Sequence, residues 1–273
     1  MVVLMAGPLS AQPQVAVSIR PLQLIAAAIT DGVSEPALVL DNSQDPHHPS
    51  LRPSQRRAMD TAELFLWTGP ALETGLDKVI PALSGEVVTV MDLSGLVLHS
   101  IDSFKDPHVW LDTHNAVLVA RSLTDALAAI DTGNASRYRE NLANFETTVA
   151  QLEANITSLF ELRKIPAFAV YHNGYQYFEK QFGLSHVASF TNNEEVQPAI
   201  RRVMAIRQQL IAAGVTCIIL GPAQNPTYLD NQLDMGGMRY VTVDVLAHDV
   251  APGRQGYTQF MTGLANAFAD CHP

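Results

Sequence analysis

The chain has 273 residues, of which 47% are hydrophobic and 16% charged, and its formal net charge is −10. This length suits two lobes that each bury a core, and the apolar content excludes a disordered chain. The acidic balance argues against nucleic acid as a partner, because phosphate binding requires clustered Lys and Arg side chains.

The first residues have the character of a processed export signal. Residues 1–11 read MVVLMAGPLSA, a short apolar run that ends in small residues as at a cleavage region, although it lacks a positively charged start. We therefore expect residues 1–14 to be the remnant of an export signal. No later stretch approaches the ~20 apolar residues that a membrane span needs.

The first half alternates β-rich and helical patterns. A helix is expected from Pro21 to Ala28, and Ser54 is a suitable N-cap for another. The expected strands are Val15–Ser18, Ala37–Leu40, Leu64–Trp67 and Val87–Val90. Strand-helix alternation of this kind predicts a mainly parallel sheet flanked by helices, which we assign to an N-terminal lobe over residues 15–133.

The middle of the chain is helical. One helix is expected from Asp112 to Ile130, and Asn134 can cap a second that runs to about Arg163 without Pro or Gly. At the helical rise, that second helix would be ~45 Å long. We predict that residues 134–163 form one rigid helix connecting two lobes; the alternative is two helices separated by a break.

The second half resumes the alternation over residues 164–273, the expected C-terminal lobe. The expected strands are Phe168–Val170, Cys217–Leu220 and Tyr240–Val243. The expected helices are Gly174–Phe182, Val196–Ala213 and Gly256–Ala269. The predicted fold is thus α/β with two lobes, each a mainly parallel sheet flanked by helices.

Four residues stand out as candidate metal ligands: His47, His108, His172 and Asp244. Three of them come after expected strands, where open α/β sheets bind ligands. Three imidazoles and one carboxylate suit tetrahedral Zn²⁺, whereas Mn²⁺ favours more oxygen ligands. Position alone leaves alternatives open, because a lone histidine in a loop is usually a surface residue. His48 competes with His47, and Asp244 could cap a turn.

Two further features have alternative interpretations. Asn193, Glu194 and Glu195 could form an acidic helix start or place a pair of carboxylates in a cleft between the two lobes. The cysteines, Cys217 and Cys271, are too far apart for a CxxC motif. In a cytosolic protein they would be two reduced thiols, and in an exported protein one disulfide.

Several segments, in order, resemble the solute-binding proteins of zinc ABC importers, the TroA-like group that binds Zn²⁺ or Mn²⁺ between two rigidly linked lobes. The similarity extends from about Val15 to Cys271. It rests on Ser18–Leu22, Pro46–Ser54, Trp67–Pro70, His108–Leu111, Tyr171–Leu184 and Phe190–Pro198.

The resemblance implies that His47, His108 and His172 are zinc ligands and that Asp244 stands where the family has a carboxylate. A histidine at position 172 favours zinc over manganese. The resemblance also implies a disulfide between Cys217 and Cys271. It further implies a periplasmic monomer without enzymatic activity that delivers zinc to a membrane permease, with a periplasmic zinc chaperone as a candidate second partner.

The sequence departs from this family at three places. Residues 90–106 contain only His99, so a His-rich loop is missing; Pro46 stands where some members have Glu, and Gly221 replaces a Glu before Pro222. The alternative functions are a manganese carrier of the same family and a zinc hydrolase. The hydrolase is disfavoured because the chain has no HExxH motif.

Overall fold

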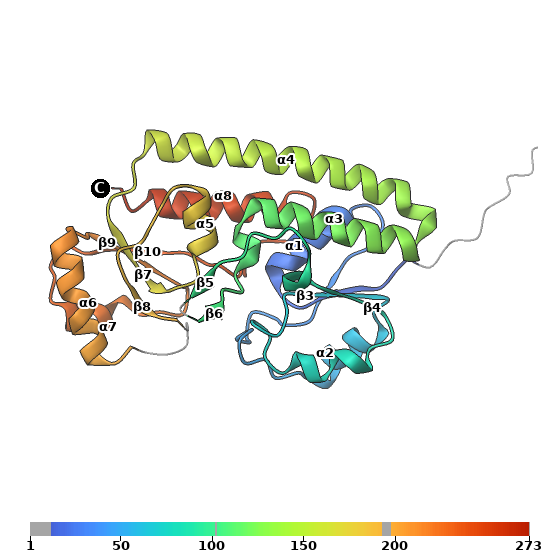
Figure 1. The fold of residues 1–273 in the computed structure, drawn as a ribbon, viewed down its shortest axis with the longest axis horizontal. Helices are drawn as coiled ribbons and strands as arrows, with labels where there is room; N and C mark the ends of the chain where they lie inside the picture. The colour runs from blue at the N-terminus through green and yellow to red at the C-terminus, as the bar shows by residue number, and fades with distance from the viewer. Residues whose placement is uncertain (1–11, 102, 193–197, 273) are drawn as a thin grey trace, which may run out of the picture.

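The computed structural model describes residues 12–101, 103–192 and 198–272. Most of the expected export-signal remnant, residues 1–14, and the expected acidic pair Glu194 and Glu195 therefore lie outside the described residues. The rest forms two α/β lobes side by side, with one long helix lying along both (Figure 1). No helix among the described residues is long and apolar enough to cross a membrane.

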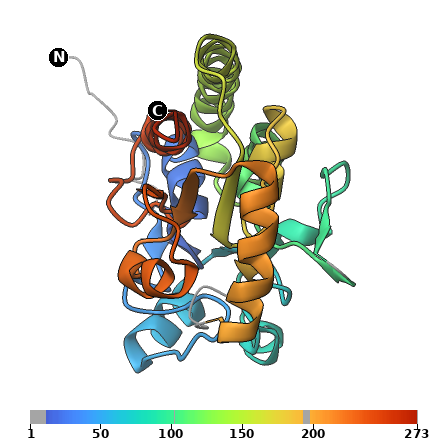
Figure 2. The same cartoon turned by 90° about the vertical axis from the view of Figure 1, so that its left-hand side faces the viewer.

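The first lobe is built on a four-stranded parallel sheet in the order β2-β1-β3-β4. Its strands are β1 (Val15–Val17), β2 (Ala37–Leu38), β3 (Leu64–Trp67) and β4 (Glu86–Thr89). Its helices are α1 (Arg20–Ile29), α2 (Pro53–Thr61) and α3 (Thr113–Ile130). A short antiparallel hairpin, β5 (Ser100–Ile101) with β6 (Phe104–Lys105), stands out from the body in Figure 2.

The second lobe repeats this plan with the strand order β10-β9-β7-β8, also parallel. Its strands are β7 (Phe168–His172), β8 (Ser189–Thr191), β9 (Cys217–Leu220) and β10 (Arg239–Thr242). Its helices are α5 (Gln176–Gln181), α6 (Ile200–Ala213), α7 (Pro226–Leu233) and α8 (Gly256–Ala269). The predicted fold class is confirmed in both lobes.

Alternation along the strands divides the second lobe into two cores. Phe168 and Val170 of β7 belong to the large core, whereas Ala169 and Tyr171 belong to a smaller one beneath helix α6. This follows from the two-residue period of a strand, which directs successive side chains to opposite faces. The large core continues into the first lobe, so one apolar interior connects both sheets.

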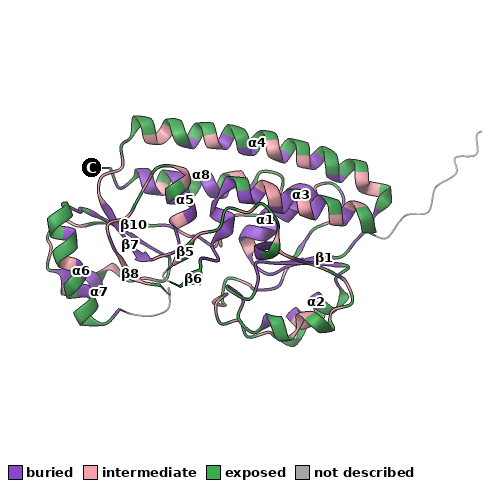
Figure 3. Cartoon of the chain, viewed as in Figure 1, coloured by how far each residue is buried: buried purple, intermediate pink, exposed green. Residues whose placement is uncertain are grey.

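Helix α4 (Ala135–Leu162) joins the lobes as one unbroken element. Its 28 residues span ~42 Å. Its buried residues recur every three or four positions and face α1, α3 and α8, whereas its outer side is exposed (Figure 3). The predicted connecting helix is confirmed; its division of the chain into domains at residues 133 and 163 stays a prediction.

One helix start differs from expectation. We expected Ser54 as an N-cap, but α2 already begins at Pro53, and the residue before it is Arg52. Proline suits this first position because its missing N–H has no intrahelical partner there. The Gln55 side chain instead accepts a hydrogen bond from the Arg52 backbone N–H at 2.8 Å, which stabilises the helix start.

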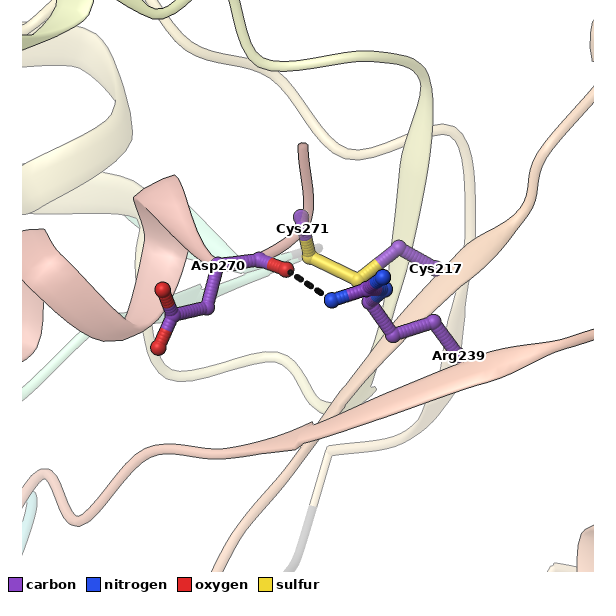
Figure 4. Close-up of a disulfide and its surroundings, with 4 residues drawn as sticks. All are labelled: Cys217, Arg239, Asp270 and Cys271. Carbon is purple, nitrogen blue, oxygen red and sulfur yellow. Dashed lines mark hydrogen bonds between the residues drawn. A yellow bond between two sulfur atoms is a disulfide. The ribbon is translucent and has the colours of Figure 1, made fainter. Parts of the chain in front are cut away.

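A disulfide joins Cys217, the first residue of β9, to Cys271, which follows α8 (Figure 4). Next to it, the Arg239 guanidinium donates a hydrogen bond to the Asp270 carbonyl at 3.2 Å. The disulfide that the resemblance implied is therefore present, and it ties the last helix to the second sheet.

Candidate metal centre

Three histidines from distant parts of the chain meet between the lobes. One ring nitrogen from each of His47, His108 and His172 lies within 4.8 Å of the other two. Nε2 of His108 is 3.2 Å from Nε2 of His172. The exposed fraction of His108 is 3% and that of His172 is 1%, whereas His47 is half-buried. The group therefore has one solvent-facing member. His48, the competing candidate, is exposed and outside this group.

Two of the histidines are the last residue of the same tripeptide, Asp-Pro-His. In the first copy, the Asp45 carboxylate accepts the backbone N–H of His47 at 2.9 Å. In the second, the Asp106 carboxylate accepts the backbone N–H of His108 at 3.0 Å. Each aspartate thereby closes a tight turn that presents the following imidazole. We did not identify this repeat as a signal, although both copies can be read directly from the sequence.

The second copy adds a bond to the imidazole ring. Asp106, which is fully buried, lies 2.7 Å from Nδ1 of His108. A carboxylate at this distance keeps the proton on Nδ1 and leaves Nε2 as a free electron-pair donor. The arrangement is the one by which proteins orient a metal-binding histidine, and sequence reasoning missed Asp106.

Backbone features position the other two histidines, His47 and His172. His172 is the last residue of β7, not the residue after it as expected, and it pairs with Thr191 of β8. The Thr74 hydroxyl donates to the carbonyl of His47. Next to Thr74, the buried Glu73 carboxylate accepts hydrogen bonds from Ser18, Thr68 and Gly69, and so connects the ends of β1 and β3.

Burial keeps the imidazoles of His47 and His172 neutral. Desolvation, reinforced by repulsion from His108, lowers the pKa of His47 to about 4. The same two causes, with repulsion from His47, hold the pKa of His172 well below its ordinary value. Neutral imidazole is the form that binds a metal ion, so these two ligands are ready to bind without losing a proton at neutral pH.

Asp244, the fourth candidate, has partners of its own. Its carboxylate accepts the backbone N–H groups of Leu246 and His248 at 2.9 and 2.6 Å and lies 3.2 Å from Nδ1 of His248. Burial would raise the pKa of Asp244, but these bonds with His248 and the backbone outweigh burial and lower it. Among the described residues, the three-histidine group does not include Asp244. Its role as a ligand stays a prediction.

The turn that Asp244 stabilises contacts the first lobe. The Asn42 side chain donates to the carbonyl of His248 at 3.1 Å. Nε1 of Trp110 donates to the carbonyl of Val245 at 2.9 Å. The loop after β10 is therefore bound to the segments that carry His47 and His108, which fixes the lobes relative to each other at the site.

The three nitrogens can bind one divalent cation. Zinc forms bonds of ~2.0–2.1 Å to histidine, which in a tetrahedron separates ligand atoms by ~3.4 Å. A contraction from the present distances of up to 4.8 Å would achieve that. An all-nitrogen set of imidazoles suits zinc, whereas Mn²⁺ favours oxygen-rich coordination.

Comparisons with known proteins agree with this chemistry. A family model described as zinc-uptake complex component A, periplasmic, matches residues 15–271. The chain is similar to the high-affinity zinc uptake system protein ZnuA of Yersinia pestis, with 30% identity over 98% of this chain and 94% of the relative. It is 28% identical to the protein of the same name from Haemophilus ducreyi, over 96% of this chain and 94% of the relative.

Solved structures show the same fold at lower identity. A crystal structure of ZnuA matches with a TM-score of 0.83 and 19% identity, covering 95% of this chain and 99% of that one. The periplasmic zinc-binding protein TroA from Treponema pallidum matches with a TM-score of 0.82 and 16% identity, covering 96% and 99%. At these identities, the structural matches establish the two-lobed fold alone.

Proposed function

Because this chain belongs to the family of periplasmic component A proteins of zinc-uptake complexes, we propose that it captures Zn²⁺ with His47, His108 and His172. It then delivers the ion to the membrane permease of an ABC importer. The observation that carries this proposal is the convergence of three imidazole nitrogens within 4.8 Å, on segments from both lobes.

The family also supports a location outside the cytoplasm. Its description is periplasmic, and the disulfide between Cys217 and Cys271 is of the kind that persists in oxidising compartments. We therefore propose the periplasm as the site of action. The family comprises transport components, so we assign this chain no catalytic role, and we propose that it acts as a monomer.

Capture would follow from the chemistry of the site. The imidazole nitrogens replace water molecules around Zn²⁺, and the protein pays no deprotonation cost at His47 or His172 because burial already keeps both neutral. The half-buried His47 would meet the ion first, since His108 and His172 lie deeper. Release then requires that the permease separates His47 from the other two ligands.

Elemental analysis of the purified protein, dialysed and then reloaded with zinc, tests the proposal. We expect one zinc per chain in the wild type and its loss in His47→Ala, His108→Ala and His172→Ala. His114→Ala is the matched control because His114 is exposed and outside the group. Wild-type protein without retained zinc, or retention that survives His172→Ala, would refute the proposal.

Two further measurements separate the remaining alternatives. Competition between Zn²⁺ and Mn²⁺ should favour zinc. A preference for manganese would indicate the alternative function, a manganese carrier of the same family. Asp244→Ala tests the predicted fourth ligand. If Asp244 binds the ion, zinc affinity should fall as steeply as in His172→Ala; if it only stabilises its own turn, the loss should be small.

A further inference from the structure

We propose that a cavity at the edge of the C-terminal lobe, lined on one side by the β5 segment of the first lobe, binds a small hydroxycarboxylate or aminocarboxylate anion, at a site separate from the three histidines. The cavity lies between the β5 segment, helix α5, strand β8 and the start of helix α6. Its volume is about 570 Å³, which falls within the range of small-molecule sites. None of the three histidines lines it, and the inference does not depend on the proposed function.

The charges around the cavity favour an anion. Lys180 and Arg202 both line it. Within the described ranges, neither takes part in an ion pair. The Arg202 guanidinium donates to the carbonyl of Ser189 at 2.9 Å, which holds the group at the cavity and leaves its other N–H donors available. A guanidinium and an ammonium in this position match a carboxylate.

The acidic group among the lining residues is already bound. Glu179 has a side chain that is 4% exposed, and its two carboxylate oxygens lie 2.8 and 2.9 Å from Nδ1 of His186. That contact keeps the negative charge of Glu179 in the wall of the cavity. Because Glu179 is buried while Lys180 and Arg202 are exposed, the charged groups that the described lining residues present to a ligand are positive.

A polar atom in the wall defines the ligand more narrowly. Oδ1 of Asn173 is buried and has no hydrogen-bond partner among the described residues, although the backbone N–H of Asn173 donates to Thr191. A buried carbonyl oxygen without a donor costs free energy. A ligand hydroxyl or ammonium group would supply that donor once the Asn173 amide turns toward the cavity. A carboxylate with a neighbouring hydroxyl or amino group supplies both the negative charge for Lys180 and Arg202 and the donor for Asn173. A simple inorganic anion such as sulfate supplies only the negative charge.

The cavity also shares a wall with the metal centre. Asn173 directly follows His172, and Nε2 of Gln176 lies 3.4 Å from the Asp106 carboxylate that orients His108. A bound anion would therefore contact the residues that surround two of the zinc ligands without touching the ligands themselves.

Calorimetric titration of metal-free protein with citrate, a hydroxytricarboxylate, tests this inference. We expect saturable binding of one citrate per chain and weaker binding of tricarballylate, which has the same carboxylates but no hydroxyl. Arg202→Gln and Lys180→Gln should each weaken citrate binding about tenfold, the worth of one charge-assisted hydrogen bond. Arg201→Gln is the matched control, since Arg201 is exposed on the same helix but does not line the cavity.

The outcomes are distinct from those that test zinc capture. Citrate binding should persist in His172→Ala, and zinc retention should persist in Arg202→Gln. Absence of saturable citrate binding, or equal affinity in Arg202→Gln and the wild type, would overturn the proposal. Loss of citrate binding in His172→Ala would also overturn it, by assigning the anion to the metal centre. Equal binding of citrate and tricarballylate would remove the assigned role of Asn173.

Discussion

The two aspartates of the Asp-Pro-His segments form similar turns but contact different parts of the following histidine. Asp106 contacts both the backbone N–H and the ring of His108, whereas Asp45 bonds the backbone N–H of His47. The carboxylate of Asp106 is also fully buried. The turn alone therefore positions His47, whereas His108 is additionally held in the tautomer that binds metal.

This difference predicts unequal effects of two matched substitutions. Asp106→Asn should lower zinc affinity by about 10–100-fold, because the amide can no longer hold a proton on Nδ1 of His108 as a carboxylate does. Asp45→Asn should have a smaller effect, since it acts on the backbone turn. Competition of each variant with a calibrated zinc chelator measures both values, and equal losses would contradict the distinction.

Gly174 leaves the space that the metal centre needs. A Cβ atom at this position would lie 2.7 and 2.8 Å from Cδ2 and Nε2 of His172 and 3.0 Å from Nε2 of His108. Its φ angle lies outside the range that disfavours other residues, so alanine is compatible with the backbone.

We therefore predict that Gly174→Ala abolishes tight zinc binding while the protein stays folded. The methyl group would push apart the two nitrogens that must approach a common ion. Zinc titration and thermal unfolding of the variant check this together, with Gly263→Ala as a control for glycine replacement where the φ angle is ordinary and a Cβ meets nothing within 4 Å. Unchanged zinc affinity in Gly174→Ala would contradict the assigned geometry.

The lowered pKa values predict the response to acid. With the pKa of His47 at about 4 and that of His172 lower than its ordinary value, protons compete with zinc at these two residues only in strong acid. Zinc affinity should therefore change little from pH 7 to about 5 and fall steeply toward pH 4. A pH series of zinc titrations measures this, and a loss centred near the free-histidine value of ~6.5 would contradict it.

The same shift affects the stability of the metal-free protein with a defined sign. A histidine whose pKa is lower in the folded state binds protons more readily when unfolded. His47 thus lowers stability progressively as the pH falls from ~6.5 toward about 4. Bound zinc should offset this loss, because it binds the folded state.

At the scale of elements, the disulfide closes a long loop. Its two cysteines are 54 positions apart in the sequence, and α7, β10 and α8 lie between them. Loop-closure entropy for that length corresponds to about 4 kcal/mol. The bond lies at the end of α8, at the start of β9, whereas His172 is at the opposite end of the neighbouring strand β7.

Cys217→Ser with Cys271→Ser should accordingly lower the free energy of unfolding by about 4 kcal/mol and leave zinc stoichiometry unchanged. Denaturant unfolding measures the first quantity and elemental analysis the second. Thiol titration of denatured wild-type protein should find no free thiols, because both cysteines are in the disulfide. Two reactive thiols would show that the bond does not form in the prepared protein.

Sequence patterns identified the helices and strands whose buried residues form a clear local pattern. The strands Leu64–Trp67 and Cys217–Leu220 and the helix Gly256–Ala269 have the expected bounds. The two strands are short apolar runs with clear limits, and the helix has apolar residues at helical spacing. Strand β8 (Ser189–Thr191) and helix α7 (Pro226–Leu233) were not expected. Each is short, and β8 is specified by its pairing with β7 more than by its own composition.

The candidate site was predictable to a similar degree. The three histidines were found because they stand near the ends of expected strands and because their segments resemble those of a known family. Asp106 and Gly174 were not, since their roles depend on distances to rings that come from elsewhere in the chain. Asp244 was selected because it follows an expected strand. In the structure its carboxylate accepts hydrogen bonds within its own turn, and the sequence position does not reveal these contacts.

At the scale of the molecule, the two lobes cannot move as independent bodies. Helix α8 of the second lobe packs against α1 of the first and against α4, and the apolar core is continuous between them. Tyr257 donates to the carbonyl of Trp110 at 2.9 Å, and Arg254 pairs with Asp31 at 2.6 Å, both across the lobes. A hinge motion would have to break these contacts together.

We therefore expect zinc binding to change the shape of the protein very little. The radius of gyration from solution X-ray scattering should differ by less than about 1 Å between the metal-free and zinc-loaded forms, as in pre-organised complexes. His172→Ala with added zinc provides the baseline. A contraction of several ångströms would show that the lobes close over the ion.

The position of Cys271 also constrains the biogenesis of the protein. The covalent bond cannot close until synthesis has passed residue 271 and helix α8 has docked on the second sheet. Until then, the strand that carries Cys217 holds its place through neighbouring strands alone. A nascent or prematurely terminated chain therefore remains unlocked and open to proteolysis. Formation of the disulfide therefore marks a chain whose synthesis has passed residue 271.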